Sequence, residues 1–173
     1  LYSNVIENCR FDSCGCGVYV GIRAEAFVVS NCVVLNSYIG IHCIGGNNRI
    51  IGCLMRSCTY GFDMTSQSAA DNDGHSTFIG LVIIHNTHAI KADNIEYGAL
   101  FNGCTVFYGD IVLTNTTGII FNGCEMGSLS TVTGSNSLGA RIMNTVFNDM
   151  LSSVVSNVCL ENCTNIDGTI FAN

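Results

Sequence analysis

Hydrophobic residues alternate with polar ones along most of the chain, in short runs that recur at a regular interval. Each run contains Asn or Gly followed by a small residue, usually Cys, and this dipeptide returns every 18 to 28 residues. Apolar residues spaced by two are typical of β-strands, whereas an α-helix repeats every 3.6 residues. The eight dipeptides are Asn8-Cys9, Asn31-Cys32, Gly52-Cys53, Gly80-Leu81, Gly103-Cys104, Gly123-Cys124, Asn144-Thr145 and Asn162-Cys163.

Each repeat is expected to contain several short strands. The residue two positions after the small residue is apolar in most repeats, so both side chains should point inward. A second strand follows within each of the first five repeats, at residues 17–20, 40–43, 61–64, 89–92 and 110–113. Such a repeat without helical periodicity predicts an all-β solenoid, a parallel β-helix of about eight coils with no substantial α-helix. A leucine-rich repeat has a similar period, but its Leu grid is missing here.

The repeat extends over the whole sequence, which predicts one domain spanning residues 1–173. It is already running at Asn4 and is still running at Ile170 and Phe171. Solenoids carry distinct capping repeats at their ends. We therefore expect the chain to be an excerpt of a longer protein, with the caps outside it.

Charge is sparse and unevenly balanced. Charged residues make up 11% of the chain, hydrophobic residues 48%, and the net charge is −7. Binding to a nucleic-acid backbone requires clustered Lys and Arg, and the six present here are scattered. No apolar run is long enough to span a bilayer. Neither nucleic acid nor membrane is an expected partner.

The eleven Cys have three interpretations. An odd count in a chain of this length argues against a disulfide framework. Zinc sites use paired Cys-x-x-Cys knuckles, and the only close pair is Cys14 and Cys16. Because the Cys recur with the repeat, we interpret them as small, buried, free thiols that fill a corner of each coil. No metal or other cofactor is expected.

Two stretches resemble coils of a known family: Asn-Cys-x-Phe-x-x-Cys around Cys9, leading to Gly-Val-x-Val at Gly17, and Asn31-Cys32, leading to Gly40-Ile41. Both are similar to the pectate-lyase-like right-handed, single-stranded parallel β-helix family. That family includes pectate lyases, polygalacturonases, alginate epimerases and viral tailspikes. Low charge and coils rich in Ser, Asn, Gly and Thr look most similar to a phage tailspike or tail-appendage segment. The resemblance implies a place in the virion tail, or otherwise secretion.

The family places substrate on the outside of one sheet, so the outward column of the second strand is the first candidate site. It reads Tyr19, His42, Asp63, Lys91 and Val112. We expect His42, Asp63 and Lys91 to be near neighbours, and a His, a carboxylate and a cation together can carry out general acid–base catalysis. Tyr19 could stack on a sugar ring. The alternative is that these are ordinary polar positions on the outside of a sheet.

The longest interval between repeats holds the second candidate site. Residues 65–77 form a polar insertion, and insertions in solenoids map to loops that often bind ligands. Asp71 and Asp73 are additional catalytic candidates, and His75 is a candidate for substrate binding. Asp63 lies two residues before the insertion, so both candidates could form one site. The alternative is a polar loop without a ligand.

One outward column of the first strand is apolar in its middle: Arg10, Val33, Leu54, Val82, Thr105, Glu125, Val146 and Thr164, with Leu35, Ile84 and Phe107 beside it. A contiguous apolar surface marks an interface. Because the spikes it resembles are commonly trimers, we expect a homotrimer joined through this sheet. A slip of one residue in the inward assignment is the alternative.

These features predict the β-helical body of a phage tailspike or appendage that binds a cell-surface polysaccharide, and they leave open whether it also cleaves the polysaccharide. A free polysaccharide lyase, hydrolase or epimerase of the pectate-lyase-like superfamily is the second possibility. A structural spacer without a ligand is the third.

Overall fold

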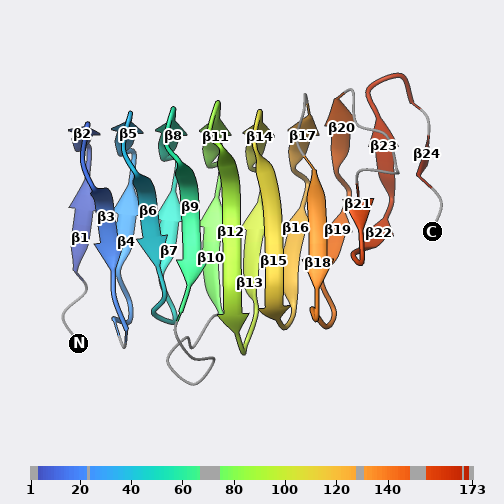
Figure 1. Cartoon of the computed structure of the whole chain (residues 1–173), viewed down its shortest axis with the longest axis horizontal. Helices are drawn as coiled ribbons and strands as arrows, with labels where there is room; N and C mark the ends of the chain where they lie inside the picture. The colour runs from blue at the N-terminus through green and yellow to red at the C-terminus, as the bar shows by residue number, and fades with distance from the viewer. Residues whose placement is uncertain are drawn as a thin grey trace.

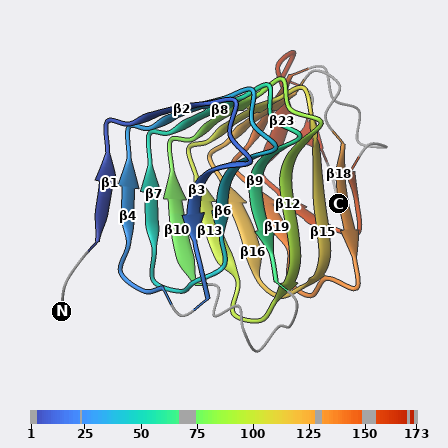
Figure 2. The same ribbon diagram turned by 60° about the vertical axis from the view of Figure 1, so that its left-hand side comes forward.

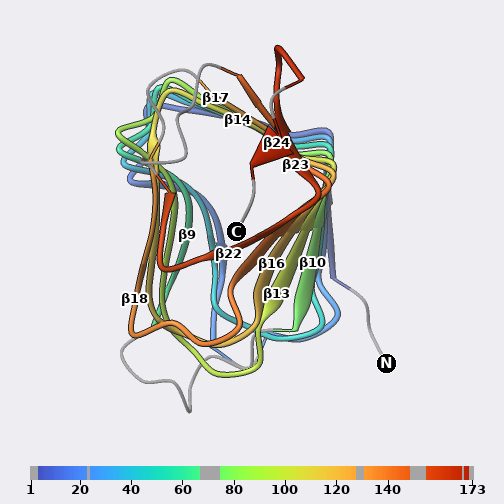
Figure 3. The same ribbon diagram turned by 90° about the vertical axis from the view of Figure 1, so that its right-hand side faces the viewer.

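The computed structural model describes residues 4–22, 24–66, 75–127, 131–148, 155–168 and 170–171. In these residues the chain is all-β: a parallel solenoid of about seven turns, without a helix (Figure 1). Each turn contributes one strand to each of three sheets, which enclose the core when the molecule is seen along its axis (Figure 3). No helix long and apolar enough to cross a membrane is found in the part of the chain that is described.

The three sheets are named here A, B and C in the order in which the chain reaches them, and Figure 2 shows their strands stacking coil by coil. Sheet A contains β1 (Val5–Glu7), β4 (Val28–Ser30), β7 (Arg49–Ile51), β10 (Ser76–Ile79), β13 (Ala99–Asn102), β16 (Ile119–Asn122), β19 (Arg141–Met143) and β22 (Cys159–Glu161). Sheet B contains β2 (Arg10–Asp12), β5 (Val33–Leu35), β8 (Leu54–Arg56), β11 (Val82–Ile84), β14 (Thr105–Phe107), β17 (Glu125–Gly127), β20 (Val146–Asn148), β23 (Cys163–Asn165) and β24 (Ile170–Phe171). Sheet C contains β3 (Cys16–Val20), β6 (Ile39–Cys43), β9 (Tyr60–Thr65), β12 (His88–Ile95), β15 (Asp110–Thr116), β18 (Val132–Ser135) and β21 (Val155–Ser156).

The turn count is about one lower than the eight repeats predicted from the sequence. The eighth repeat supplies β22 to sheet A and β23 to sheet B, but among the described residues it supplies no strand to sheet C. Instead β24 pairs antiparallel with β23, the only antiparallel pairing among the described strands.

The inward rows form a continuous apolar core. In sheet A the rings of Phe78, Phe101 and Phe121 stack along the axis, with centroids 4.7 and 4.8 Å apart, and Phe62 of sheet C packs against Phe78 at 4.6 Å. All four are fully buried. Sheet C opens with Gly where the side chains of sheet B press against it: a Cβ on Gly61 would lie 2.7 Å from a methyl group of Ile83. The Gly near the start of the first three sheet C strands is therefore a packing requirement.

The corner between sheets A and B explains the recurrent Asn-or-Gly. In all eight repeats the first residue of the dipeptide has a positive φ, between 48° at Asn144 and 61° at Gly52 and Gly103. This left-handed conformation turns the chain from one sheet into the next, and Gly and Asn tolerate it best. The dipeptide is thus the bend of each coil.

The thiols occupy the inside of this bend. Cys32, Cys53 and Cys163 donate their S–H groups to the carbonyl two residues earlier, at 3.3, 3.5 and 3.4 Å. Thr145 does the same with its hydroxyl, at 2.9 Å, and therefore fits the Cys column. The described Cys are all free, as the sequence predicted. Burial raises the pKa of Cys53 to about 11, which keeps its thiol protonated.

Candidate functional site

The outward face of sheet C carries the column predicted from the sequence. Tyr19 pairs in register with His42, His42 with Asp63, Asp63 with Lys91, and Lys91 with Val112. Adjacent parallel strands are about 4.8 Å apart, so each residue lies directly beside the next one along the solenoid axis. The structure therefore brings together the three residues proposed for acid–base chemistry and the neighbouring Tyr.

His42 and Asp63 form the centre of this site. The distance from His42 Nδ1 to Asp63 Oδ2 is 3.2 Å, and both side chains are largely buried, with exposed fractions of 13% and 10%. Asp63 Oδ1 also accepts a hydrogen bond from the backbone N–H of Thr65 at 2.9 Å. Burial raises the pKa of Asp63, but the hydrogen bonds from His42 and Thr65 outweigh it, and the pKa of this carboxyl lies below its usual value.

Tyr19 covers one side of the His42 ring. The two rings are stacked, with centroids 5.1 Å apart and planes inclined by 12°. Because 62% of Tyr19 remains exposed, its outer surface is open to solvent. An exposed aromatic ring beside a carboxylate–imidazole pair offers an apolar platform next to a proton donor and acceptor.

Lys91 is in register with Asp63 but does not pair with it. Among the described residues its ammonium group forms no ion pair; Nζ lies over the ring of Tyr60, 5.3 Å from the centroid, in a cation–π arrangement. Of the predicted trio, His42 and Asp63 therefore interact directly, whereas Lys91 turns toward Tyr60 in the neighbouring row.

That neighbouring row was not found from the sequence. Tyr38 and Tyr60 meet edge to face at 5.5 Å, and His88 stacks on Tyr60 at 5.2 Å. Proximity to the Tyr60 hydroxyl raises the pKa of Tyr38. His88 Nδ1 is buried and has no hydrogen-bond partner within the described structure. The sequence does contain a signal for this row. When the repeats are aligned on Gly40, Gly61 and Ala89, the residues directly before Gly61 and Ala89 are Tyr60 and His88, which places them side by side.

A third imidazole stacks on a Tyr at the corner between sheets B and C. His85 and Tyr108 lie 4.4 Å apart with planes inclined by 7°, and both have a positive φ. His85 and His88 both contribute rings to the edge of the sheet C face. We call Tyr19, Tyr38, Tyr60, Tyr108, His42, His85, His88, Asp63 and Lys91 the aromatic strip.

Of the polar insertion at residues 65–77, the structure describes residues 65, 66 and 75–77. Asp71 and Asp73 lie outside the described residues. His75 lies in the connection from sheet C to sheet A, where its ring meets Tyr97 edge to face at 6.2 Å. His75 therefore belongs to the far end of the sheet C strands, close to a second exposed Tyr.

Of the other carboxylates, Asp110 lies next to the aromatic strip, in register with His88 on the neighbouring strand. Asp110 accepts a hydrogen bond from the Thr131 hydroxyl at 2.7 Å, while Glu125 projects from sheet B. No group of three or more His, Cys, Asp or Glu side chains that could hold a metal ion occurs among the described residues.

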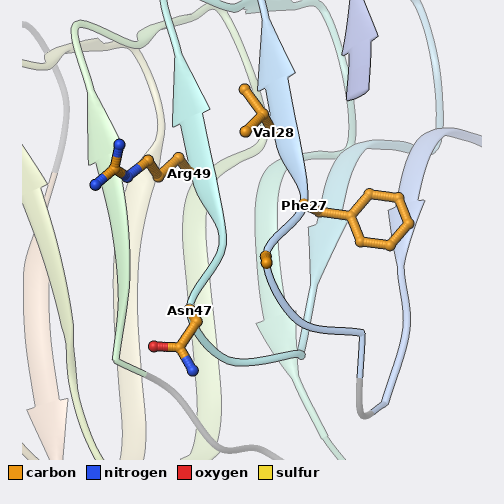
Figure 4. A pocket seen from close by; sticks show the side chains of 5 residues that line it. Phe27, Val28, Asn47 and Arg49 are labelled. Carbon is orange, nitrogen blue, oxygen red and sulfur yellow. The ribbon is translucent and has the colours of Figure 1, made fainter. Parts of the chain in front are cut away.

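Hollows in the surface lie away from the aromatic strip. One, of about 280 Å³, is lined by Ala26, Phe27, Val28, Asn47 and Arg49 near the start of the sheet A strands, with Phe27 and Arg49 pointing away from each other (Figure 4). Another, of about 210 Å³, is lined by Leu35, Asn36, Arg56 and Ser57 at the edge of sheet B. Neither includes a residue of the strip, which is an open surface suited to an extended ligand.

Known proteins give little guidance on function. No protein-family model matches the sequence, and no curated protein matches it significantly. Among solved structures the chain is similar to trypsin-treated QnrB1, a plasmid-mediated fluoroquinolone resistance protein, with a TM-score of 0.36 and 12% identity. That alignment covers 94% of this chain and 88% of the other, but at this TM-score it carries no argument. The resemblance to the pectate-lyase-like family and to phage tailspikes stays a prediction.

Proposed function

We propose that the chain is the β-solenoid body of a phage tailspike or tail appendage, and that the aromatic strip binds a cell-surface polysaccharide. The observation that carries the proposal is the exposed ring of Tyr19, stacked on an imidazole that is itself held by Asp63. Sugar rings have apolar faces and a polar rim, so they are complementary to an aromatic ring flanked by hydrogen-bonding groups.

The spacing of the strip supports a chain-like ligand. Tyr19 and Tyr38 are 62% and 57% exposed and Tyr108 is 40% exposed, and these rings lie on the first, second and fifth coils, with Tyr60 on the third. Coils follow one another at about 4.8 Å, so a polymer lying along the solenoid axis meets several rings at once. Several weak contacts between these rings and one polysaccharide chain add up to a measurable affinity. The polar side chains around the rings fix the orientation of the sugars.

A free polysaccharide lyase, hydrolase or epimerase is the second candidate, and the His42–Asp63 pair favours it. A carboxylate at Nδ1 orients an imidazole and leaves Nε2 to exchange a proton with a substrate. Hydrolysis of a glycosidic bond uses two carboxyl groups on opposite sides of the bond. Asp63 is engaged by His42, and Asp110, in register with His88, accepts a hydrogen bond from Thr131, so proton abstraction by the His42–Asp63 pair fits the geometry better than hydrolysis.

The experiment is binding of the full chain to a panel of bacterial capsule and cell-wall glycans, followed by analysis of products. Tyr19→Ala should weaken binding about tenfold or more, because it removes the most exposed ring of the strip. Tyr97→Ala is the matched control, since Tyr97 is also 62% exposed but lies at the far end of the sheet C strands. Equal losses in both variants would contradict the strip as the binding site.

Cleavage is separated from binding by Asp63→Asn. If the pair is catalytic, this variant retains binding and loses product formation. If the panel is bound but never cleaved, the chain is a binding body alone. No binding to any glycan would leave the structural spacer as the remaining interpretation.

A further inference from the structure

The outward face of sheet B has a self-complementary pattern of charge. Its register confirms the apolar column predicted from the sequence, with Val33, Leu54 and Val82 side by side. Leu35, Ile84 and Phe107 lie in the second outward row, and all six side chains are half-buried rather than covered. A cation, Arg56 of β8, lies in the second row between Leu35 and Ile84, and an anion, Glu125 of β17, lies in the first row next to Thr105.

Both charges are exposed and unpaired within the chain. Neither Arg56 nor Glu125 takes part in an ion pair among the described residues, whereas Arg10 at the end of the sheet is paired with Asp12 at 3.4 Å. Arg56 and Glu125 are three strand spacings apart, about 14 Å along the axis. They are therefore too far apart to neutralise each other, but well placed to meet charges on another molecule.

We propose that sheet B packs face to face on sheet B of a second copy of this chain, with the two solenoid axes antiparallel. A two-fold axis along the strand direction, between β11 and β14, exchanges β8 with β17. Arg56 of each copy then lies diagonally across from Glu125 of the other, over Gly127, which has no side chain. The same axis sets Ile84 opposite Phe107 and Val33 opposite Val146, while Leu54 lies opposite Glu125 and Leu35 opposite Asn148.

The charges select this arrangement over the homotrimer predicted from the resemblance. In a parallel trimer, equivalent coils meet around the axis, so Arg56 would face Arg56 and Glu125 would face Glu125. Like charges brought together at an interface oppose association, and opposite charges fix register and orientation. Shifting the two-fold axis by one coil would remove the opposition of Arg56 and Glu125, so the charges also specify the register.

The test is sedimentation equilibrium of the full chain and of two charge-reversal variants. The wild type should show a concentration-dependent equilibrium between monomer and dimer. Arg56→Glu and Glu125→Arg should each weaken self-association about tenfold or more, since every dimer contains two of these contacts. Arg49→Glu, which makes the same change of charge on sheet A, should leave the equilibrium unchanged.

The deciding measurement is an equimolar mixture of the two variants. In a mixed antiparallel dimer every substituted position faces an opposite charge, so the mixture should dimerise as strongly as the wild type while each variant alone does not. In a parallel trimer like charges meet at positions 56 and 125 in the wild type and in each variant alone, so each variant would associate about as strongly as the wild type and the mixture more strongly than the wild type. A trimer mass, a monomer at all concentrations, or a mixture that fails to associate although both variants are folded by circular dichroism would overturn the proposal.

Discussion

Sheets B and C share one backbone plan and present opposite chemistries to solvent. Both lie over the same core, and their outward rows repeat at the same interval. The face of sheet B is apolar in its middle, with Arg56 and Glu125 as unpaired charges within it, whereas sheet C carries the rings, imidazoles and carboxylate of the aromatic strip. The repeat therefore determines the inside of each coil and leaves the outside free to differ. The proposed function therefore depends on rows of outward side chains that run across the coils, and not on any single coil.

The largest expected effect is at the line where the two sheets meet inside the core. Gly40 of sheet C would place a Cβ 2.7 Å from Met55 Cγ of sheet B, and also against the backbone of Gly61. Gly40→Val should lower the free energy of unfolding by about 3 kcal/mol, because the core is already full. Urea unfolding measures the loss. Gly103→Ala is the control: nothing lies within 4 Å of its Cβ position, and only the positive φ opposes it, at about 1 kcal/mol.

Raising the pH should lower the stability of the protein through Cys53, the buried thiol at the bend between sheets A and B. The pKa of Cys53 is raised from 9.0 to about 11 by burial, so the folded state holds this proton more tightly than the unfolded chain. The contribution is complete below pH 9 and is lost as the pH rises through the folded pKa, at a cost of about 2 kcal/mol. Thermal unfolding between pH 8 and 11 measures it. Cys53→Ser keeps a donor for the Ile51 carbonyl, and its stability should fall less steeply over the same range.

Lowering the pH should reduce the stability of the protein through Asp63 on the outward face of sheet C. The pKa of Asp63 is lowered below its ordinary value of 3.8, so its stabilising contribution is present above that value and is lost as the pH falls through the folded pKa. At neutral pH, Asp63→Asn should cost about 1 kcal/mol, since a charge-assisted hydrogen bond becomes a neutral one. Stability of the variant should depend less on pH below 4. Leu54→Asn on sheet B should leave the acid dependence as it is in the wild type.

The smallest expected effect is at the corner that joins the two faces. Tyr108→Ala removes the ring stacked on His85 and should lower the free energy of unfolding by about 0.5 kcal/mol, because both rings are exposed. Glycan binding should fall more than stability does, if the strip extends to this corner. Unchanged binding in a folded Tyr108→Ala variant would show that the glycan-binding surface extends only as far as Tyr60 and His88.

Much of the fold was predictable because strand periodicity is strict. The alternation of two placed Tyr19, His42, Asp63 and Lys91 in one row, and a slip of one residue would have moved all of them to the core. The bends were visible as Asn or Gly, although their left-handed geometry was not inferred. The number of turns was overestimated, since the dipeptide marks only the corner between sheets A and B and says nothing about whether sheet C follows.

The candidate site was predictable in part. Row membership follows from register, but the direction of a long side chain does not, and Lys91 turned to Tyr60 instead of Asp63. Tyr38, Tyr60 and His88 were missed because they lie where the chain enters sheet C, one or two positions before the Gly or Ala that marked the start of each expected strand. Ring stacking between coils depends on the exact path of those bends, which no two-residue alternation encodes.

The left-handed bend has a consequence for the length of the molecule. Since one residue with positive φ turns every coil between sheets A and B, each coil begins and ends in the same way and can be added or removed whole. Lengthening then proceeds in fixed steps of about 4.8 Å, without altering the cross-section. A solenoid of this kind can be lengthened by duplication of the gene segment that encodes a coil, and each added coil extends the rows of side chains on its surface by one residue.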